Sequence, residues 1–147
     1  MNGKEFLDVA QCLAKETHSE AFMRSAVSRA YYAAHNFGRH VLRQLGFGHI
    51  ADGGRHGPVW EYFQNCGDPQ LSQAGRALAD LHGWRRGADY DLHKPEFGSA
   101  NQAALSINSA RLIVSQLGNC NNPGVSGRVK RGMKLYEHRI LRPGSSP

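Results

Sequence analysis

The sequence has little of three things that mark common protein classes, namely long apolar runs, cysteine and strand-like alternation. Apolar residues make up 40% of the 147 positions. No uninterrupted run approaches the ~20 apolar residues that a membrane-spanning helix needs. The first residues, MNGKEFLDVAQ, also lack the apolar segment and small-residue cleavage site of a secretory signal. We therefore expect a soluble, cytoplasmic protein without a membrane partner.

Cysteine is too rare and too scattered to build a disulfide framework. Cys12, Cys66 and Cys120 are an odd number, and no two of them form a Cys-x-x-Cys pair. The eight histidines include no pair that comes with the further ligands of a zinc site. We expect reduced thiols, no bound metal and no cofactor.

Strand-like alternation is absent from residues 1–118, whereas helical spacing of apolar residues is frequent. Glycine and proline divide this part into expected helices at residues 4–18, 19–45, 58–66, 69–91 and 96–118. Residues 46–57 are rich in glycine and read as a surface loop. The sequence thus predicts an all-α domain over residues 1–118, an antiparallel up-and-down bundle of four to five helices.

Residues 119–147 form a basic extension of this domain. The net charge of the chain is +6, and this segment holds six basic residues against one acid, a local charge of +5. A polyanion partner is one reading, with nucleic-acid contacts from Arg128, Lys130, Arg131 and Lys134. Solubility or packing on an acidic neighbour is an equal alternative. The run RVKRGMKLYEHRIL alternates mildly, so a short strand or hairpin, or disorder until binding, is expected.

Two expected helices carry an arginine within an apolar stripe. Arg85 follows Leu78 and Leu81 at helical spacing, and Arg29 is spaced in the same way on the second helix. A buried guanidinium without a partner costs several kcal/mol. We expect Asp89 to hold Arg85, and we favour Arg29 as a structural arginine paired with Asp89 or Asp91.

Three stretches in the same order resemble the HEPN superfamily of small helical-bundle proteins. They are SAVSRAYYAAHNF at residues 25–37, RHGPVWEYF at residues 55–63 and LADLHGWRRGADYD at residues 78–91. The resemblance covers about residues 4–118 and leaves the basic extension unexplained. It implies a bundle that commonly dimerises and that in many members is a metal-independent ribonuclease.

Ribonuclease members of this superfamily carry an arginine followed, after four to six intervening residues, by a histidine. Arg86 and His93 have six residues between them and satisfy this spacing, whereas Arg85, which aligns with the family arginine, has seven. The resemblance therefore implies Arg85, Arg86 and His93 as catalytic candidates. His56 in the expected loop and Tyr90 on the fourth helix are supporting candidates. Their simpler roles are a loop residue and a core aromatic.

The implied chemistry is cleavage of RNA by its own ribose. A neutral His93 would take the proton of a 2′-hydroxyl while an arginine held the phosphate, leaving a 2′,3′-cyclic phosphate. Seven residues of helical rise separate Arg86 from His93 by roughly 10 Å, which favours a homodimer that brings two helix ends together. In the simpler alternative, His93 caps the C-terminus of its helix as a cation.

Three functions stay open at this point. The first is a HEPN-type endoribonuclease, a toxin or defence component with RNA as substrate and a nucleotidyltransferase-type antitoxin as a possible partner. The second is a non-catalytic module of the same fold that binds a nucleotide, RNA or a nucleotidyltransferase. The third is a dimeric scaffold whose basic extension docks on an acidic partner. The alignment of Arg85 with the family arginine favours the second, whereas the spacing of Arg86 and His93 together with the basic extension favours the first.

Overall fold

The computed structural model describes residues 3–16 and 19–141, and these residues are almost entirely helical. Seven α-helices occur in this part of the chain, more than the four to five predicted from the sequence. They are α1 (Glu5–Lys15), α2 (Glu20–Gln44), α3 (Gly48–Ala51), α4 (Gly57–Gln64), α5 (Pro69–Tyr90), α6 (Ala100–Gly118) and α7 (Pro123–Leu141), with short 3-10 helices at Pro95–Gly98 and Asn119–Asn121.

The helix boundaries follow from residues that the sequence displays. Asp68 caps α5, because its side chain accepts a hydrogen bond from the backbone N–H of Leu71 at 3.0 Å. Ser99 caps α6 in the same way, accepting from the N–H of Gln102 at 3.1 Å. After α2 the chain turns at Gly46, whose φ of 92° suits glycine.

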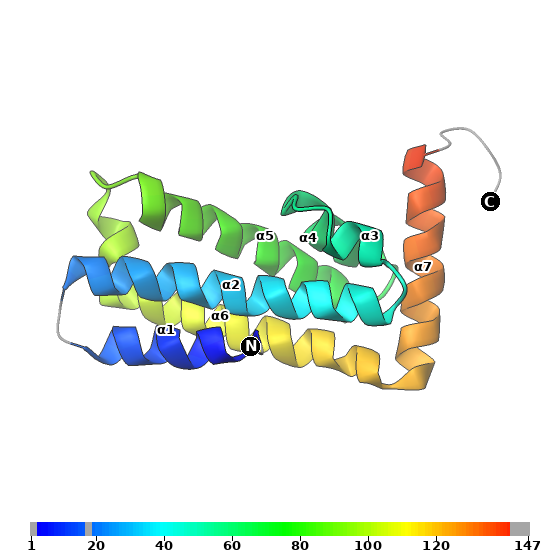
Figure 1. The fold of residues 1–147 in the computed structure, drawn as a ribbon, viewed down its shortest axis with the longest axis horizontal. Helices are drawn as coiled ribbons and strands as arrows, with labels where there is room; N and C mark the ends of the chain where they lie inside the picture. Colours follow the sequence, from blue (N-terminus) through cyan, green and yellow to red (C-terminus); the bar gives the residue numbers. More distant parts are fainter. Residues whose placement is uncertain (1–2, 17–18, 142–147) are drawn as a thin grey trace.

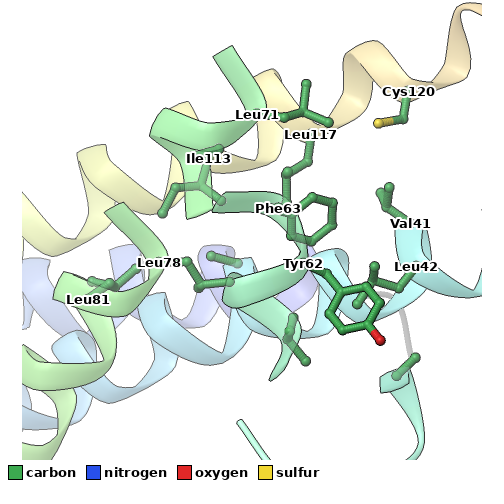
Figure 2. Close-up of a cluster of buried hydrophobic side chains, with 14 of the residues drawn as sticks. Val41, Leu42, Tyr62, Phe63, Leu71, Leu78, Leu81, Ile113, Leu117 and Cys120 are labelled. Carbon is green, nitrogen blue, oxygen red and sulfur yellow. The ribbon is translucent and has the colours of Figure 1, made fainter. Parts of the chain in front are cut away.

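The longest helix, α2, is the centre of the packing. Figure 1 shows α1, α2, α5 and α6 lying side by side, and α2 contacts α1, α3, α4, α5 and α6. The main core lies where α2, α4, α5 and α6 meet, as Figure 2 shows. Its largest fully buried side chains include Tyr31, Leu42, Phe63, Leu78 and Ile113. Burial of each such side chain contributes about 1.5–3 kcal/mol to folding.

The expected loop and the expected strand both contain a helix. Residues 48–51 form the single turn α3 within the glycine-rich segment. Residues 123–141 form α7, so the predicted strand, hairpin or disorder is wrong there. Val129, Met133 and Tyr136 all pack in or on the core. Their separation of four and then three residues is the spacing of one helical face. Residues 142–147 lie outside the described residues.

Helix α7 stands across one end of the other helices (Figure 1). Gly132 permits this docking, because a side chain at this position would overlap the carbonyl oxygen of Cys66. Glu137 adds polar contacts, accepting from the Tyr62 hydroxyl at 2.9 Å and lying 2.7 Å from Nε2 of His49. The helix is therefore attached to α3 and α4 by apolar and polar contacts.

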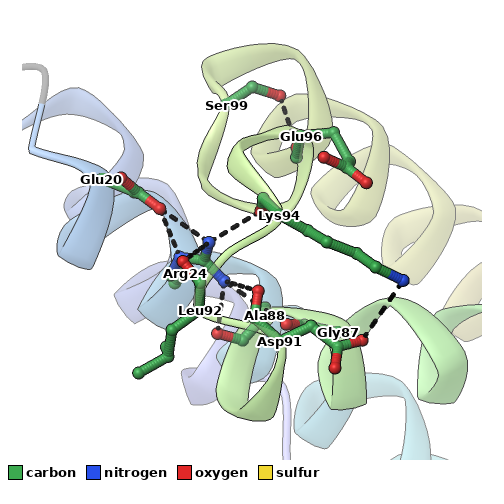
Figure 3. A network of polar contacts seen from close by, with 9 residues as sticks. All are labelled: Glu20, Arg24, Gly87, Ala88, Asp91, Leu92, Lys94, Glu96 and Ser99. Atoms are coloured by element: carbon green, nitrogen blue, oxygen red, sulfur yellow. Dashed lines mark hydrogen bonds and ion pairs between the residues drawn. The ribbon is translucent and has the colours of Figure 1, made fainter.

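The arginine of α2 that is buried is Arg24, not Arg29. Arg24 is 7% exposed and reaches the C-terminus of α5, as Figure 3 shows. Its guanidinium donates to the carbonyl oxygens of Ala88 at 3.1 Å and Lys94 at 2.8 Å, and pairs with Glu20 at 2.7 Å. It also donates to the carbonyl oxygens of Gly87, Asp91 and Leu92. Arg24 thus satisfies several carbonyls that a helix end leaves unpaired.

Two absences hold for residues 3–16 and 19–141. None of their helices has both the length and the apolar character needed to cross a membrane. Their three cysteines are free thiols, with Cys12 exposed and Cys66 and Cys120 buried.

Candidate functional site

Three histidines and an arginine from three elements gather around the buried ring of Tyr31. Tyr31 and His35 lie one turn apart on α2, His56 precedes α4, and His82 lies on α5 with Arg85. The ring centroid of Tyr31 lies 5.3 Å from that of His35, 5.7 Å from that of His56 and 5.3 Å from that of His82. We call these five residues the Tyr31 cluster.

The histidines also contact one another. The His35 and His56 rings are stacked with centroids 4.5 Å apart, and the His56 and His82 centroids are 5.4 Å apart. The ring of Trp60 lies beside that of His82, with the two centroids 4.9 Å apart. Close imidazoles that all became charged would repel one another, so this packing favours the neutral forms.

Arg85 is the member of the cluster that carries a charge, and its side chain is 8% exposed. Its position within the apolar stripe of α5 predicted this burial. Its guanidinium carbon is 5.4 Å from the ring centroid of Tyr31 and 5.7 Å from that of Tyr32. Nη1 lies 3.4 Å from a carboxylate oxygen of Asp89, which confirms Asp89 as its holder. Nε of Arg85 has no hydrogen-bond partner among the described residues. The Nε–H group of Arg85 is therefore a buried hydrogen-bond donor without an acceptor among the described residues.

Burial and positive charge keep the three histidines neutral at pH 7. Burial is the main cause that lowers the pKa of His35 to about 3 and that of His82 to about 4. It also lowers the pKa of His56, followed by the charges of Arg85 and Arg39. A neutral imidazole can accept a proton, so the site contains potential general bases.

The Tyr31 hydroxyl and Nδ1 of His56 form a short hydrogen bond. Burial raises the pKa of Tyr31, so its hydroxyl stays protonated at neutral pH. The direction of this bond decides the chemistry of His56. When Nδ1–H donates to the Tyr31 oxygen, Nε2 is the nitrogen that can take a proton.

A small cavity of about 180 Å³ opens beside the cluster. Among its lining residues are Tyr32, Asn36 and the two histidines His35 and His56. His35 is 5% exposed, and its Nδ1 has no hydrogen-bond partner in the described part of the chain. An unpartnered buried nitrogen beside a polar cavity is a position where a ligand can bind.

The charge around this cavity is positive. Arg39 and Arg55 line it, and Arg86 lies near enough to His82 to lower the pKa of that residue. Arg39 is partly neutralised by Asp52 at 3.6 Å. No acidic side chain of the described residues forms an ion pair with Arg55 or Arg86. An anion such as a phosphate would find compensating charge here.

The other sequence candidates of α5 and the turn that follows it lie on the surface. Arg86 and His93 are exposed, and Tyr90 is 71% exposed, so its expected role as a core aromatic is wrong. Helix α5 ends at Tyr90, which leaves His93 in the following turn. The structure therefore separates the exposed pair Arg86 and His93 from the buried Arg85.

The expected ion pair of Arg29 is also wrong. Arg29 is exposed, and its guanidinium carbon lies 5.7 Å from the ring centroid of Phe6. In the described part of the chain, Asp89 pairs with Arg85, and Asp91 lies 3.9 Å from the amino group of Lys94. Arg29 takes no part in the Tyr31 cluster.

The basic residues of α7 lie on its solvent side. Lys130, Arg131 and Lys134 are exposed, while the neighbouring Val129 and Met133 are buried. Arg128 lies 3.3 Å from a carboxylate oxygen of Asp68, so its charge is partly used within the chain. Three of the four residues predicted to contact nucleic acid, Lys130, Arg131 and Lys134, are therefore exposed and basic.

Sequence reasoning missed His35 and His82. His35 lies one turn after Tyr31, within the stretch at residues 25–37, and His82 lies one turn before the candidate Arg86. That spacing was the available signal. The contact of both with His56 depends on the packing of α2 against α4 and α5, which the sequence does not display.

The histidines of the cluster are not arranged as metal ligands. No group of three or more His, Cys, Asp or Glu side chains among residues 3–16 and 19–141 is placed to hold a metal ion. Comparisons with protein-family models, curated proteins and solved structures returned no match to this chain.

Proposed function

We propose that this protein is a metal-independent endoribonuclease of HEPN type, with its reaction centre at the Tyr31 cluster. One observation carries the proposal. A neutral histidine, His56, and a buried arginine, Arg85, contact the same tyrosine beside a cavity lined by Arg39 and Arg55. A base and several guanidinium groups are what cleavage by a ribose 2′-hydroxyl requires.

The reaction starts when Nε2 of His56 takes the proton of the 2′-hydroxyl. The 2′-oxygen then attacks the adjacent phosphorus, the bond from phosphorus to the 5′-oxygen breaks, and that oxygen takes a proton from water. The hydroxide that remains takes the proton held on His56, which restores the base. Arg55 and Arg85 stabilise the negative charge that develops on the phosphate. The products are a 2′,3′-cyclic phosphate and a 5′-hydroxyl, and DNA is not cut.

In this proposal His56 replaces His93 as the base. His56 is half-buried against Tyr31 and has a lowered pKa, whereas His93 is exposed in the turn after α5. Arg86 and His93 are assigned to binding of the RNA chain beyond the scissile phosphate. The exposed basic residues of α7, Lys130, Arg131 and Lys134, are assigned the same role.

A second function is favoured by the way Arg85 is held. This side chain is 8% exposed and paired with Asp89, which restricts its approach to a scissile phosphate. The alternative is a non-catalytic HEPN module that binds a nucleotide, RNA or a nucleotidyltransferase. It predicts binding of the anion at the same cavity without turnover.

The proposal extends to the assembly and setting of the protein. We assign it the up-and-down bundle of HEPN domains, a homodimer, and a toxin or defence role under a nucleotidyltransferase-type antitoxin. Leu105 and Leu112, exposed and one heptad apart on α6, support a helix-to-helix contact between two copies. Light scattering of the purified protein tests this part, and a monomer at all concentrations would contradict it.

The function is tested by cleavage of a mixed RNA pool in excess EDTA, with the product ends analysed for cyclic phosphate. His56→Ala and Arg85→Lys should each reduce the rate by at least about 100-fold, the size of a lost general base or oxyanion partner. Arg86→Ala and His93→Ala should retain cleavage, with weaker RNA binding. Loss of cleavage in His93→Ala but not in His56→Ala would move the reaction centre to the end of α5.

A further inference from the structure

A larger cavity of about 640 Å³ lies next to the Tyr31 cluster, between the start of α1 and the C-terminal half of α2. The larger and the smaller cavity share Asn36 and Arg39 in their linings. The two cavities are therefore adjacent along α2, and we call them together the α2 groove. None of the catalytic, supporting or nucleic-acid-binding candidates named from the sequence lines the larger part, although Asn36 and Phe37 belong to the stretch at residues 25–37.

The larger part of the α2 groove combines aromatic rings with positive charge. Phe6 and Phe37 supply the rings, and Arg39 and Arg43 line it as well. Asp52 pairs with both arginines, at 3.6 Å from Arg39 and 2.5 Å from Arg43. Alternation of rings and cations is typical of surfaces that bind single-stranded nucleic acid.

Phe37 offers the better stacking surface of the two rings. Its side chain is half-buried, so the ring is fixed from below by the core. The amino group of Lys4 lies 5.3 Å from its centroid, and the ring of His40 lies 6.2 Å from it. Lys4 is exposed, and a base that stacks on Phe37 would replace its ammonium over the ring.

We propose that the α2 groove binds the nucleotide next to the scissile phosphate of a single-stranded RNA, with its base on Phe37 and its phosphate at Arg39. This inference rests on the proposed function for the identity of the ligand, but it concerns binding alone. The base must be unpaired, because in a duplex the neighbouring base pairs cover its faces. The groove thus selects single-stranded over double-stranded RNA.

The test is the affinity for a short, fluorescently labelled 2′-O-methyl RNA, which cannot be cut by its own ribose, measured by anisotropy. Phe37→Leu keeps an apolar side chain but removes the ring, and we expect an affinity about tenfold weaker, as for one lost base stack. Phe22→Leu is the matched control, because Phe22 is 41% exposed on the same helix and lines neither cavity. It should bind like the unaltered protein.

Equal affinities of Phe37→Leu and Phe22→Leu, or equal binding of single-stranded and duplex RNA, would overturn the inference. If Phe37→Leu fails to fold, photo-crosslinking of a 4-thiouridine oligonucleotide to the unaltered protein replaces it. Adducts are expected within residues 3–6 or 36–43, and adducts elsewhere only would overturn the inference. Phe37-dependent binding without cleavage of natural RNA would contradict the endoribonuclease alone, whereas cleavage without this dependence would contradict the groove alone.

Discussion

The imidazole rings of His35 and His56 lie stacked, with centroids 4.5 Å apart and planes inclined by 24°. His35 belongs to α2 and His56 to the segment before α4, so tertiary packing creates this pair. Burial and, after it, the neighbouring His56 ring disfavour the charged form of His35. The pair is therefore neutral at pH 7 and sensitive to acid.

The first prediction concerns stability against pH. His35 has a pKa of about 3 in the folded protein, below the ordinary value of about 6.5. Between these values the unfolded chain binds more protons, so stability is lost as pH falls from 6.5. For His35 alone, the free energy of unfolding should fall by about 2 kcal/mol between pH 7 and pH 5. Urea unfolding at both pH values measures this.

Two variants identify the group responsible for that loss. His35→Gln should reduce the pH dependence by roughly the same amount. His40→Gln is the control, because His40 is exposed on the same helix. An unchanged pH dependence in His35→Gln would show that His35 is not held neutral by the fold.

The second prediction concerns Arg24, whose guanidinium joins α2 to the end of α5 (Figure 3). Arg24→Ala leaves several buried carbonyl oxygens without a donor and should lower the free energy of unfolding by about 3 kcal/mol. Arg29→Ala, at an exposed position of the same helix, should cost less than about 1 kcal/mol. Similar losses in the two variants, measured by urea unfolding, would disprove the assignment.

The third prediction concerns the docking of α7. Gly132→Ala places a methyl group against the backbone of Cys66, so α7 should separate from α4. Gly127→Ala on the same helix is the control, since the nearest atom to its Cβ would be the flexible end of Arg131 at 3.6 Å. Hydrogen exchange should increase across residues 123–141 in the first variant only. Equal protection in both would mean that α7 does not need this contact.

The fourth prediction concerns the charge of Arg85 on His56. In the unaltered protein the imidazole of His56 should titrate below 6.5, because burial and Arg85 lower its pKa. Arg85→Gln removes the charge, so the midpoint should move upward. NMR titration of the His56 ring measures both midpoints without depending on activity. An identical midpoint in the variant would show that Arg85 does not act on His56.

The helices of the bundle were predictable because the sequence marks their ends. Pro58, Pro69 and Pro95 lie at or near the starts of helical segments, and Gly46 and Gly118 lie at or near helix ends. Burial of Arg85 was predictable too, because Leu78 and Leu81 define the inner face of α5. In each case the signal is local and lies within one or two turns.

The remaining features depend on contacts that local spacing does not reveal. Alanines lie on several sides of α2, so their spacing does not define one buried face. The sequence therefore predicted Arg29 within the apolar stripe, whereas the buried face contains Arg24. The mild alternation of residues 128–141 concealed the helical spacing of Val129 and Met133. The meeting of His35, His56 and His82 requires α2, α4 and α5 to be packed.

The central claim is that His56, beside Tyr31 and Arg85, is the base of a ribose-dependent cleavage. The most direct measurement uses a DNA oligonucleotide with a single ribonucleotide, incubated in EDTA with the unaltered protein or His56→Ala, and mass spectrometry of the products. We predict cleavage only after the ribonucleotide, with a 2′,3′-cyclic phosphate end, and its loss in His56→Ala. Cleavage that persists in His56→Ala, or no cleavage by the folded unaltered protein, would contradict the claim.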